Sequence, residues 1–174
     1  MPLSGGEAAR EGFRYEDWVL LEYFAKIFSG EVRSVRFEGL IPAKAEAVVE
    51  FAEGDREFVQ CKAGAESWTP TRLHADGLLQ AMLDASVSGN RFRFVSIFPC
   101  ALREVAELAN RLTSSAAFKQ EVLGRKKNEL VAEVQAKLKV TEEQTWEMLR
   151  CAKFESLDRV TAERSFHNSA SIRV

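Results

Sequence analysis

The sequence contains little cysteine and no metal-binding pattern built from it. Its three cysteines, Cys61, Cys100 and Cys151, are odd in number and widely spaced. They form neither a CxxC pair nor a zinc-ligand pattern with His74 and His167. A disulfide scaffold and a structural zinc site are therefore both disfavoured. We expect free thiols in a reducing compartment, the cytoplasm.

Long apolar segments and a large net charge are also missing. No hydrophobic run reaches the length of a membrane span, and the first residues lack the basic start and apolar core of a signal peptide. The formal net charge is −2, so the field of the whole molecule does not attract a polyanion. Contact with nucleic acid would require a local basic patch.

The order of predicted elements indicates an α/β fold. Hydrophobic periodicity, capping residues and turn signals predict helices and strands in a mixed order. We expect helices over 12–29, 69–87, 101–112, 118–139 and 141–154, and strands over 32–38, 46–51, 58–62 and 92–98. This order predicts a mixed central sheet flanked by helices, with a helical C-terminal third. We divide the chain into an α/β core, 1–115, and a helical extension, 116–174, which belongs to the same domain or leads to a partner region.

The predicted β-hairpin carries the residue pattern that points most clearly to chemistry. Its second strand ends in Gln60-Cys61-Lys62, and Glu46 opens its first strand. Because strand side chains alternate with period two, Gln60 and Lys62 share one face. A lysine on a half-buried strand needs a charge partner to offset its desolvation. A cluster of carboxylate, metal ion and phosphodiester would supply that partner.

These residues suit phosphodiester hydrolysis, which needs a divalent cation on oxygen ligands and positive charge at the transition state. Glu46, together with the Gln60 side chain or the Cys61 carbonyl, can bind Mg²⁺ or Mn²⁺. Lys62 can orient or deprotonate water and stabilise the developing charge. Glu16, on the first helix, can reach the metal directly or through its water shell.

The hairpin register decides whether this site can form. A two-residue Gly54-Asp55 loop would place Ala47 across from Lys62, which would damage the site. An odd-length loop or a bulge would place Glu46 on the correct face. The sequence leaves both registers open.

Several ordered segments resemble the PD-(D/E)xK nuclease superfamily. More narrowly, they resemble the double-stranded-DNA endonuclease domains fused to bacterial antiviral STAND NTPases and found as effectors in cyclic-nucleotide antiphage systems. The resemblance extends over about residues 12–118. The segments that carry it are Gly12-Phe13-Arg14-Tyr15-Glu16, Phe58-Val59-Gln60-Cys61-Lys62-Ala63, Trp68-Thr69 with Leu73, Gly77-Leu78-Leu79, Arg93-Phe94-Val95-Ser96 and the stretch 102–111. In one departure, the family usually has an aspartate where this chain has Glu46.

The resemblance implies a restriction-endonuclease-like fold with Glu16, Glu46, Gln60 and Lys62 as the catalytic set. It also implies Mg²⁺- or Mn²⁺-dependent cleavage of double-stranded DNA with little sequence preference, in antiphage defence. Cutting both strands requires two active sites, so we expect a homo-oligomer. A STAND NTPase or sensor region of a larger protein is the other expected partner.

Two alternatives remain open. In the first alternative, favoured by glutamate at position 46 in place of the usual aspartate, the chain is a catalytically silent nuclease fold that serves as a DNA-binding or regulatory domain. In the second alternative, the helices after Ala101 form an assembly module that recruits a partner. This alternative predicts an exposed apolar stripe on those helices. Arg91 and Arg93, at the edge of a buried strand, would border a DNA cleft or cap the sheet.

Overall fold

A computed structural model describes residues 5–37, 45–63, 66–123, 126–158, 161 and 164, without the side chains of residues 5–14. The described elements confirm the predicted α/β class. In chain order they are α1 (Gly5–Phe28), β1 (Val32–Phe37), β2 (Ala47–Phe51), β3 (Arg56–Lys62), α2 (Pro70–Ala75), α3 (Leu78–Val87), β4 (Arg91–Ser96), α4 (Arg103–Arg111), α5 (Ser115–Val122), α6 (Lys126–Leu138), α7 (Glu142–Cys151) and β5 (Ala152–Ser156).

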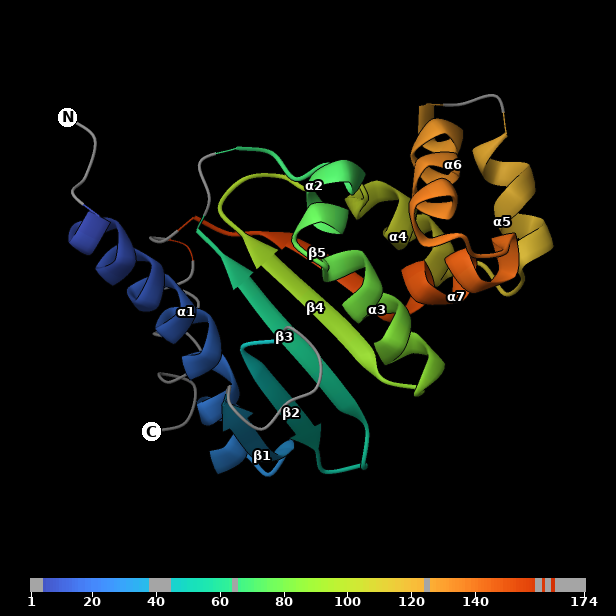
Figure 1. The fold of residues 1–174 in the computed structure, drawn as a ribbon. Coiled ribbons are helices and arrows are strands. Elements are labelled where there is room, and N and C mark those ends of the chain that lie inside the picture. Colours follow the sequence, from blue (N-terminus) through green and yellow to red (C-terminus); the bar gives the residue numbers. More distant parts are fainter. Residues whose placement is uncertain are drawn as a thin grey trace.

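The five strands form one mixed sheet in the order β1-β2-β3-β4-β5 (Figure 1). The β1–β2 and β2–β3 pairs are antiparallel, whereas β3–β4 and β4–β5 are parallel. The carboxyl ends of β3 and β4 therefore lie at the same edge of the sheet, next to the start of β2. Residues that close β3 and open β2 are brought together at this edge.

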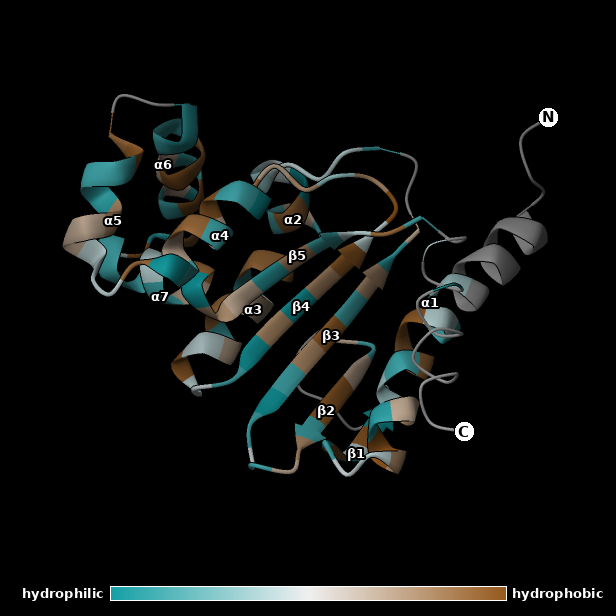
Figure 2. Ribbon diagram, turned by 180° about the vertical axis from the view of Figure 1, so that it is seen from behind, coloured by the Kyte–Doolittle hydropathy of each residue, from teal (hydrophilic) through white to brown (hydrophobic). Residues whose placement is uncertain are grey.

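Two apolar clusters cover the two faces of the sheet, because alternate strand residues point to opposite sides. On one face, Tyr15, Val19 and Tyr23 of α1 pack against strand residues such as Val59 and Cys61. On the other face, α2 to α7 pack against residues that include Phe92, Phe94, Ala152 and Phe154. Figure 2 shows from behind that α1 runs beside β1 to β3, away from the other helices.

The C-terminal third contains a strand that was not expected. The helix predicted over 141–154 ends at Cys151, and β5 pairs in parallel with β4, with Phe154 opposite Phe94. Phe154 is 4% exposed and packs in the same cluster as Phe94. Burial of this ring against the sheet overrides the helical pattern.

Two other predicted helices are each interrupted. The helix expected over 69–87 is split into α2 and α3 at Gly77, which has a φ of 74° that favours glycine. The helix expected over 118–139 is split into α5 and α6. The capping box at Thr141 and Gln144 is confirmed. The boundary at residue 115 stays a prediction, although β5 beyond it belongs to the central sheet. None of the described helices has the length and apolar character needed to cross a membrane.

Candidate functional site

The hairpin register places Glu46 directly opposite Gln60. Ala47 pairs with Val59 and Glu50 with Arg56, and the Glu46 amide donates to the Val59 carbonyl at 2.9 Å. The loop joining the strands, 52–54, has an odd number of residues, because the Phe51 amide donates to the Asp55 carbonyl across it at 2.9 Å. Of the two registers predicted, the structure adopts the odd-length one. Ala47 does not face Lys62.

The side chains of Glu46, Gln60 and Lys62 converge at this end of the hairpin. The Glu46 carboxylate accepts hydrogen bonds from the Gln60 side-chain amide and from the backbone N–H of Cys61. The Lys62 Nζ atom lies 3.5 Å from Glu46 Oε1. The Gln60 amide also approaches the Cys61 carbonyl oxygen, with an N–O distance of 3.4 Å. Glu46 is therefore the charge partner that Lys62 was expected to require.

Burial makes the electrostatics of this cluster unusual. The Glu46 side chain is 13% exposed, Gln60 is buried, and Lys62 is 36% exposed towards solvent. Burial raises the pKa of Glu46 to about 7, and the negative charge of Glu16 adds to this rise. The hydrogen bond from the Cys61 N–H and the positive charge of Lys62 both lower the pKa and so oppose the rise. The carboxylate thus exchanges a proton near neutral pH, where a bound cation can replace that proton.

Glu16 lies on α1, one residue after the buried Tyr15, and it is half-buried. Its negative charge contributes to the raised pKa of Glu46 and, after burial and Glu46, to the raised pKa of the Cys61 thiol. The structure therefore places Glu16 within electrostatic reach of the hairpin cluster. The Gly12, Phe13 and Arg14 side chains of the same motif lie outside the described residues.

Cys61 contributes its backbone, not its thiol, to the cluster. The thiol is fully buried in the apolar layer beneath α1, whereas the N–H and carbonyl of the same residue face Glu46 and Gln60. The sequence predicted the carbonyl as a ligand but missed the N–H as a donor to Glu46. Only the hairpin register, which the sequence left open, could have indicated that contact.

The donors gathered here fit a hard cation better than zinc. Within the described part of the chain, no three His, Cys, Asp or Glu side chains gather as a ligand set. Glu46 would instead supply a carboxylate, Gln60 an amide oxygen once the amide turns over, and Cys61 a carbonyl oxygen, with Glu16 within electrostatic reach. An all-oxygen set with few carboxylates is typical of Mg²⁺ and Mn²⁺ sites, which keep several waters.

Comparisons with known proteins are sparse. No protein-family model and no curated protein matches the chain. Among solved structures, the chain is similar to a Moraxella osloensis protein described as a Cap4 SAVED/CARF-domain containing receptor, with a TM-score of 0.53 and 16% sequence identity. The match covers 95% of this chain and 38% of that one, so this chain spans less than half of the receptor's length. At this identity the similarity shows a shared fold.

Proposed function

We propose that this protein is a metal-dependent endonuclease of the PD-(D/E)xK type that hydrolyses phosphodiester bonds in double-stranded DNA with little sequence preference. The observation that carries the proposal is the convergence of the Glu46 carboxylate, the Gln60 amide and the Lys62 ammonium at one end of the hairpin. The resemblance of the surrounding segments to nuclease domains supports the choice of substrate.

The residues divide the chemistry between them. Glu46 and Glu16, with the Gln60 amide oxygen and the Cys61 carbonyl, would hold Mg²⁺ or Mn²⁺. When bound, the cation supplies Lewis-acid stabilisation and a more acidic water. Lys62 is the most exposed member of the hairpin cluster, and it would present its ammonium to the attacking water and to the phosphate oxygens. It orients that water and stabilises the negative charge that develops on the phosphate.

The biological setting belongs to the same proposal. The family that the sequence resembles contains effectors of antiphage systems, and the structural similarity to a Cap4 receptor supports that setting. We therefore propose an antiphage role in the cytoplasm. Double-strand cleavage requires two copies of the site, so the active form would be a homo-oligomer, alone or with a sensor or NTPase region.

Cleavage of supercoiled plasmid DNA in Mn²⁺ tests the proposal. The parent protein should nick and then linearise the plasmid, and Lys62→Met should reduce the rate by roughly 10²- to 10³-fold because a charge-stabilising donor is lost. Lys119→Met is the matched control, since Lys119 pairs with Glu142 at 2.8 Å on α5 and α7, away from the hairpin. The control should cleave at the parent rate.

Two outcomes would contradict the proposal. If the parent does not nick the plasmid, or if Lys62→Met nicks it equally fast, the nuclease assignment fails. Salt-sensitive DNA binding without cleavage would then favour the silent nuclease fold.

The assembly-module alternative has no structural support, because among the described large hydrophobic side chains that are exposed, only Leu123 lies after Ala101.

A further inference from the structure

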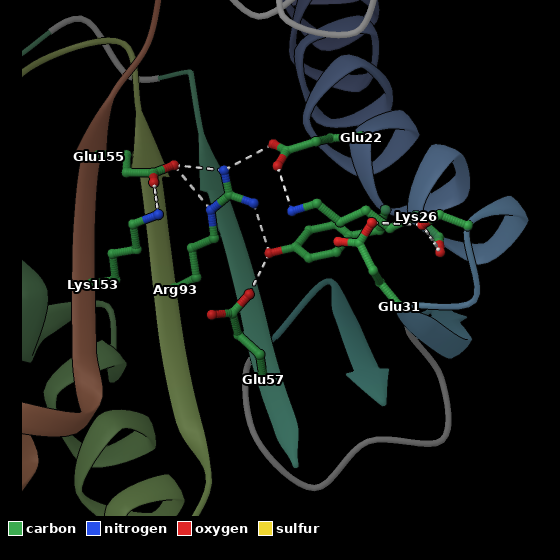
Figure 3. A network of polar contacts seen from close by, with 9 residues as sticks. Glu22, Lys26, Glu31, Glu57, Arg93, Lys153 and Glu155 are labelled. Carbon is green, nitrogen blue, oxygen red and sulfur yellow. Dashed lines mark hydrogen bonds and ion pairs between the residues drawn. The ribbon is translucent and has the colours of Figure 1, made fainter. Parts of the chain in front are cut away.

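A buried arginine, Arg93, lies in the centre of the sheet, away from the hairpin cluster. Arg93 occupies the middle of β4 and is 5% exposed, so it neither borders a cleft nor caps the sheet edge, in contrast to both sequence expectations. Figure 3 shows its guanidinium surrounded by side chains from α1, β3 and β5. The site chemistry described above uses none of these groups.

The guanidinium is bonded on every side. Its Nε and Nη2 atoms donate to Glu155 of β5, at 2.9 and 2.6 Å. Nη2 also donates to Glu22 of α1 at 3.1 Å, and Nη1 donates to the Tyr23 hydroxyl at 2.6 Å. That hydroxyl donates in turn to Glu57 of β3. Arg93 and Tyr23 together therefore join α1 to the three neighbouring strands β3, β4 and β5.

Glu22 and Glu155 stay ionised despite their burial. Burial tends to raise the pKa of Glu22 and of Glu155, yet Arg93, with Lys26 beside one and Lys153 beside the other, holds both pKa values below their usual range. Well-packed apolar side chains would join helix and sheet without this desolvation. The ion pairs instead add geometric specificity. A planar guanidinium with several fixed partners can bond to all of them in only one relative arrangement.

That arrangement determines how α1 is rotated and how far it is advanced along its axis. Glu22 and Tyr23 are adjacent, and a shift of one residue moves a helical side chain by about 1.5 Å and 100°. Such a shift would break both contacts to Arg93. A second anchor lies two turns earlier, where the Tyr15 hydroxyl donates to the Leu157 carbonyl at 2.9 Å. The anchors are about 12 Å apart along the helix.

Glu16 lies between these anchors, one residue after Tyr15. Its carboxylate is the contribution that we assign to α1 in the candidate metal site, and its position depends directly on the rotation and advance of the helix. A displacement of about 1 Å is enough to lower catalysis by two orders of magnitude. The apolar residues of α1 alone, such as Val19 and Leu20, would permit sliding on the sheet.

We propose that Arg93 is a positioning residue that holds α1 in the register that keeps Glu16 within reach of the Glu46 cluster. Arg93 fixes the position of α1 through its hydrogen bonds to Glu22 and Tyr23. The inference rests on the proposed function for the role of Glu16, but the anchoring of α1 can be measured without any catalysis.

Amide hydrogen exchange and Mn²⁺ titration test the inference on variants of the 174-residue chain. Arg93→Lys keeps the buried charge but cannot bond Glu22, Tyr23 and Glu155 together. Tyr23→Phe keeps the ring and removes the linking hydroxyl, so it serves if the first variant folds poorly. In either variant the amides of residues 15–28 should exchange at least about 10-fold faster, because the helix opens more often. Arg103→Lys, which alters an exposed pair on α4, is the control.

The Mn²⁺ titration identifies the residue through which Arg93 acts. Arg93→Lys should weaken Mn²⁺ binding by about 10- to 100-fold, as is typical for loss of a supporting contact behind a metal ligand. In a Glu16→Gln background the same substitution should have little further effect. Unchanged exchange in α1, or effects of Arg93→Lys and Glu16→Gln that multiply, would overturn the inference. Absence of Mn²⁺ binding in the parent would instead overturn the proposed function, and the exchange data would still decide whether Arg93 anchors α1.

Discussion

The buried carboxyl of Glu46 should make the stability of the metal-free protein depend on pH in a recognisable way. Burial raises the pKa of this carboxyl from 4.5 to about 7 in the folded protein. The folded state then holds the proton more tightly than the unfolded chain. The carboxyl therefore contributes most to stability below pH 4.5, and this contribution is lost as the pH rises to about 7.

The size of the effect follows from the two pKa values. One pKa unit corresponds to about 1.4 kcal/mol, so the change from 4.5 to about 7 amounts to about 3 kcal/mol. The side chain is only 13% exposed, so solvent screens little of this. Glu46→Gln has no charge to desolvate. Its free energy of unfolding relative to the parent should therefore rise by about 3 kcal/mol between pH 4.5 and pH 8.

Urea unfolding in EDTA at a series of pH values measures this difference. Glu50→Gln is the control, since Glu50 lies on β2, four residues after Glu46, but pairs with the exposed Arg33 at 3.4 Å. Its curve should run parallel to that of the parent. If the offset between parent and Glu46→Gln stays constant with pH, or grows in favour of the parent, the environment described for Glu46 is wrong.

Two further predictions concern β5 and the metal. Phe154→Ala should lower the free energy of unfolding by about 3–5 kcal/mol, because the ring is 4% exposed and packs in the core. Phe28→Ala is the control and should change the free energy of unfolding little, because Phe28 is 88% exposed. Urea titration of both variants at neutral pH measures the difference. Equal effects would contradict the placement of β5. Mn²⁺ at 100 times its dissociation constant should raise the free energy of unfolding by about 2.7 kcal/mol in the parent but not in Glu46→Gln, as measured by thermal unfolding with and without the metal. Equal stabilisation of both proteins would place the metal elsewhere.

The hairpin illustrates how far sequence patterns determine the site. Period-two alternation correctly placed Gln60 and Lys62 on one face, and the need of Lys62 for a charge partner pointed to a carboxylate. The register could not be settled, because Gly54 suits both a two-residue and an odd-length loop. A difference of one residue in the loop separates a converged site from a dispersed one.

Long-range packing explains what the sequence did not reveal. Ala152–Ser156 follows α7 without a turn signal, and it forms a strand by pairing in parallel with β4, where Phe154 lies opposite Phe94. The sequence pattern predicted that Arg93 borders a DNA cleft or caps the sheet, whereas the structure buries it in the middle of β4. The groups that bond to Arg93 come from α1 and β5, up to 71 positions away in the chain, so no local pattern could identify them.

Diffraction from crystals soaked in Mn²⁺ tests the central claim most directly. The account predicts an anomalous peak about 2.1 Å from an oxygen of Glu46, with the Gln60 amide turned to present its oxygen and the Lys62 ammonium facing the bound water. A peak elsewhere, or a hairpin end that keeps its direct Gln60–Glu46 contact at saturating Mn²⁺, would contradict it.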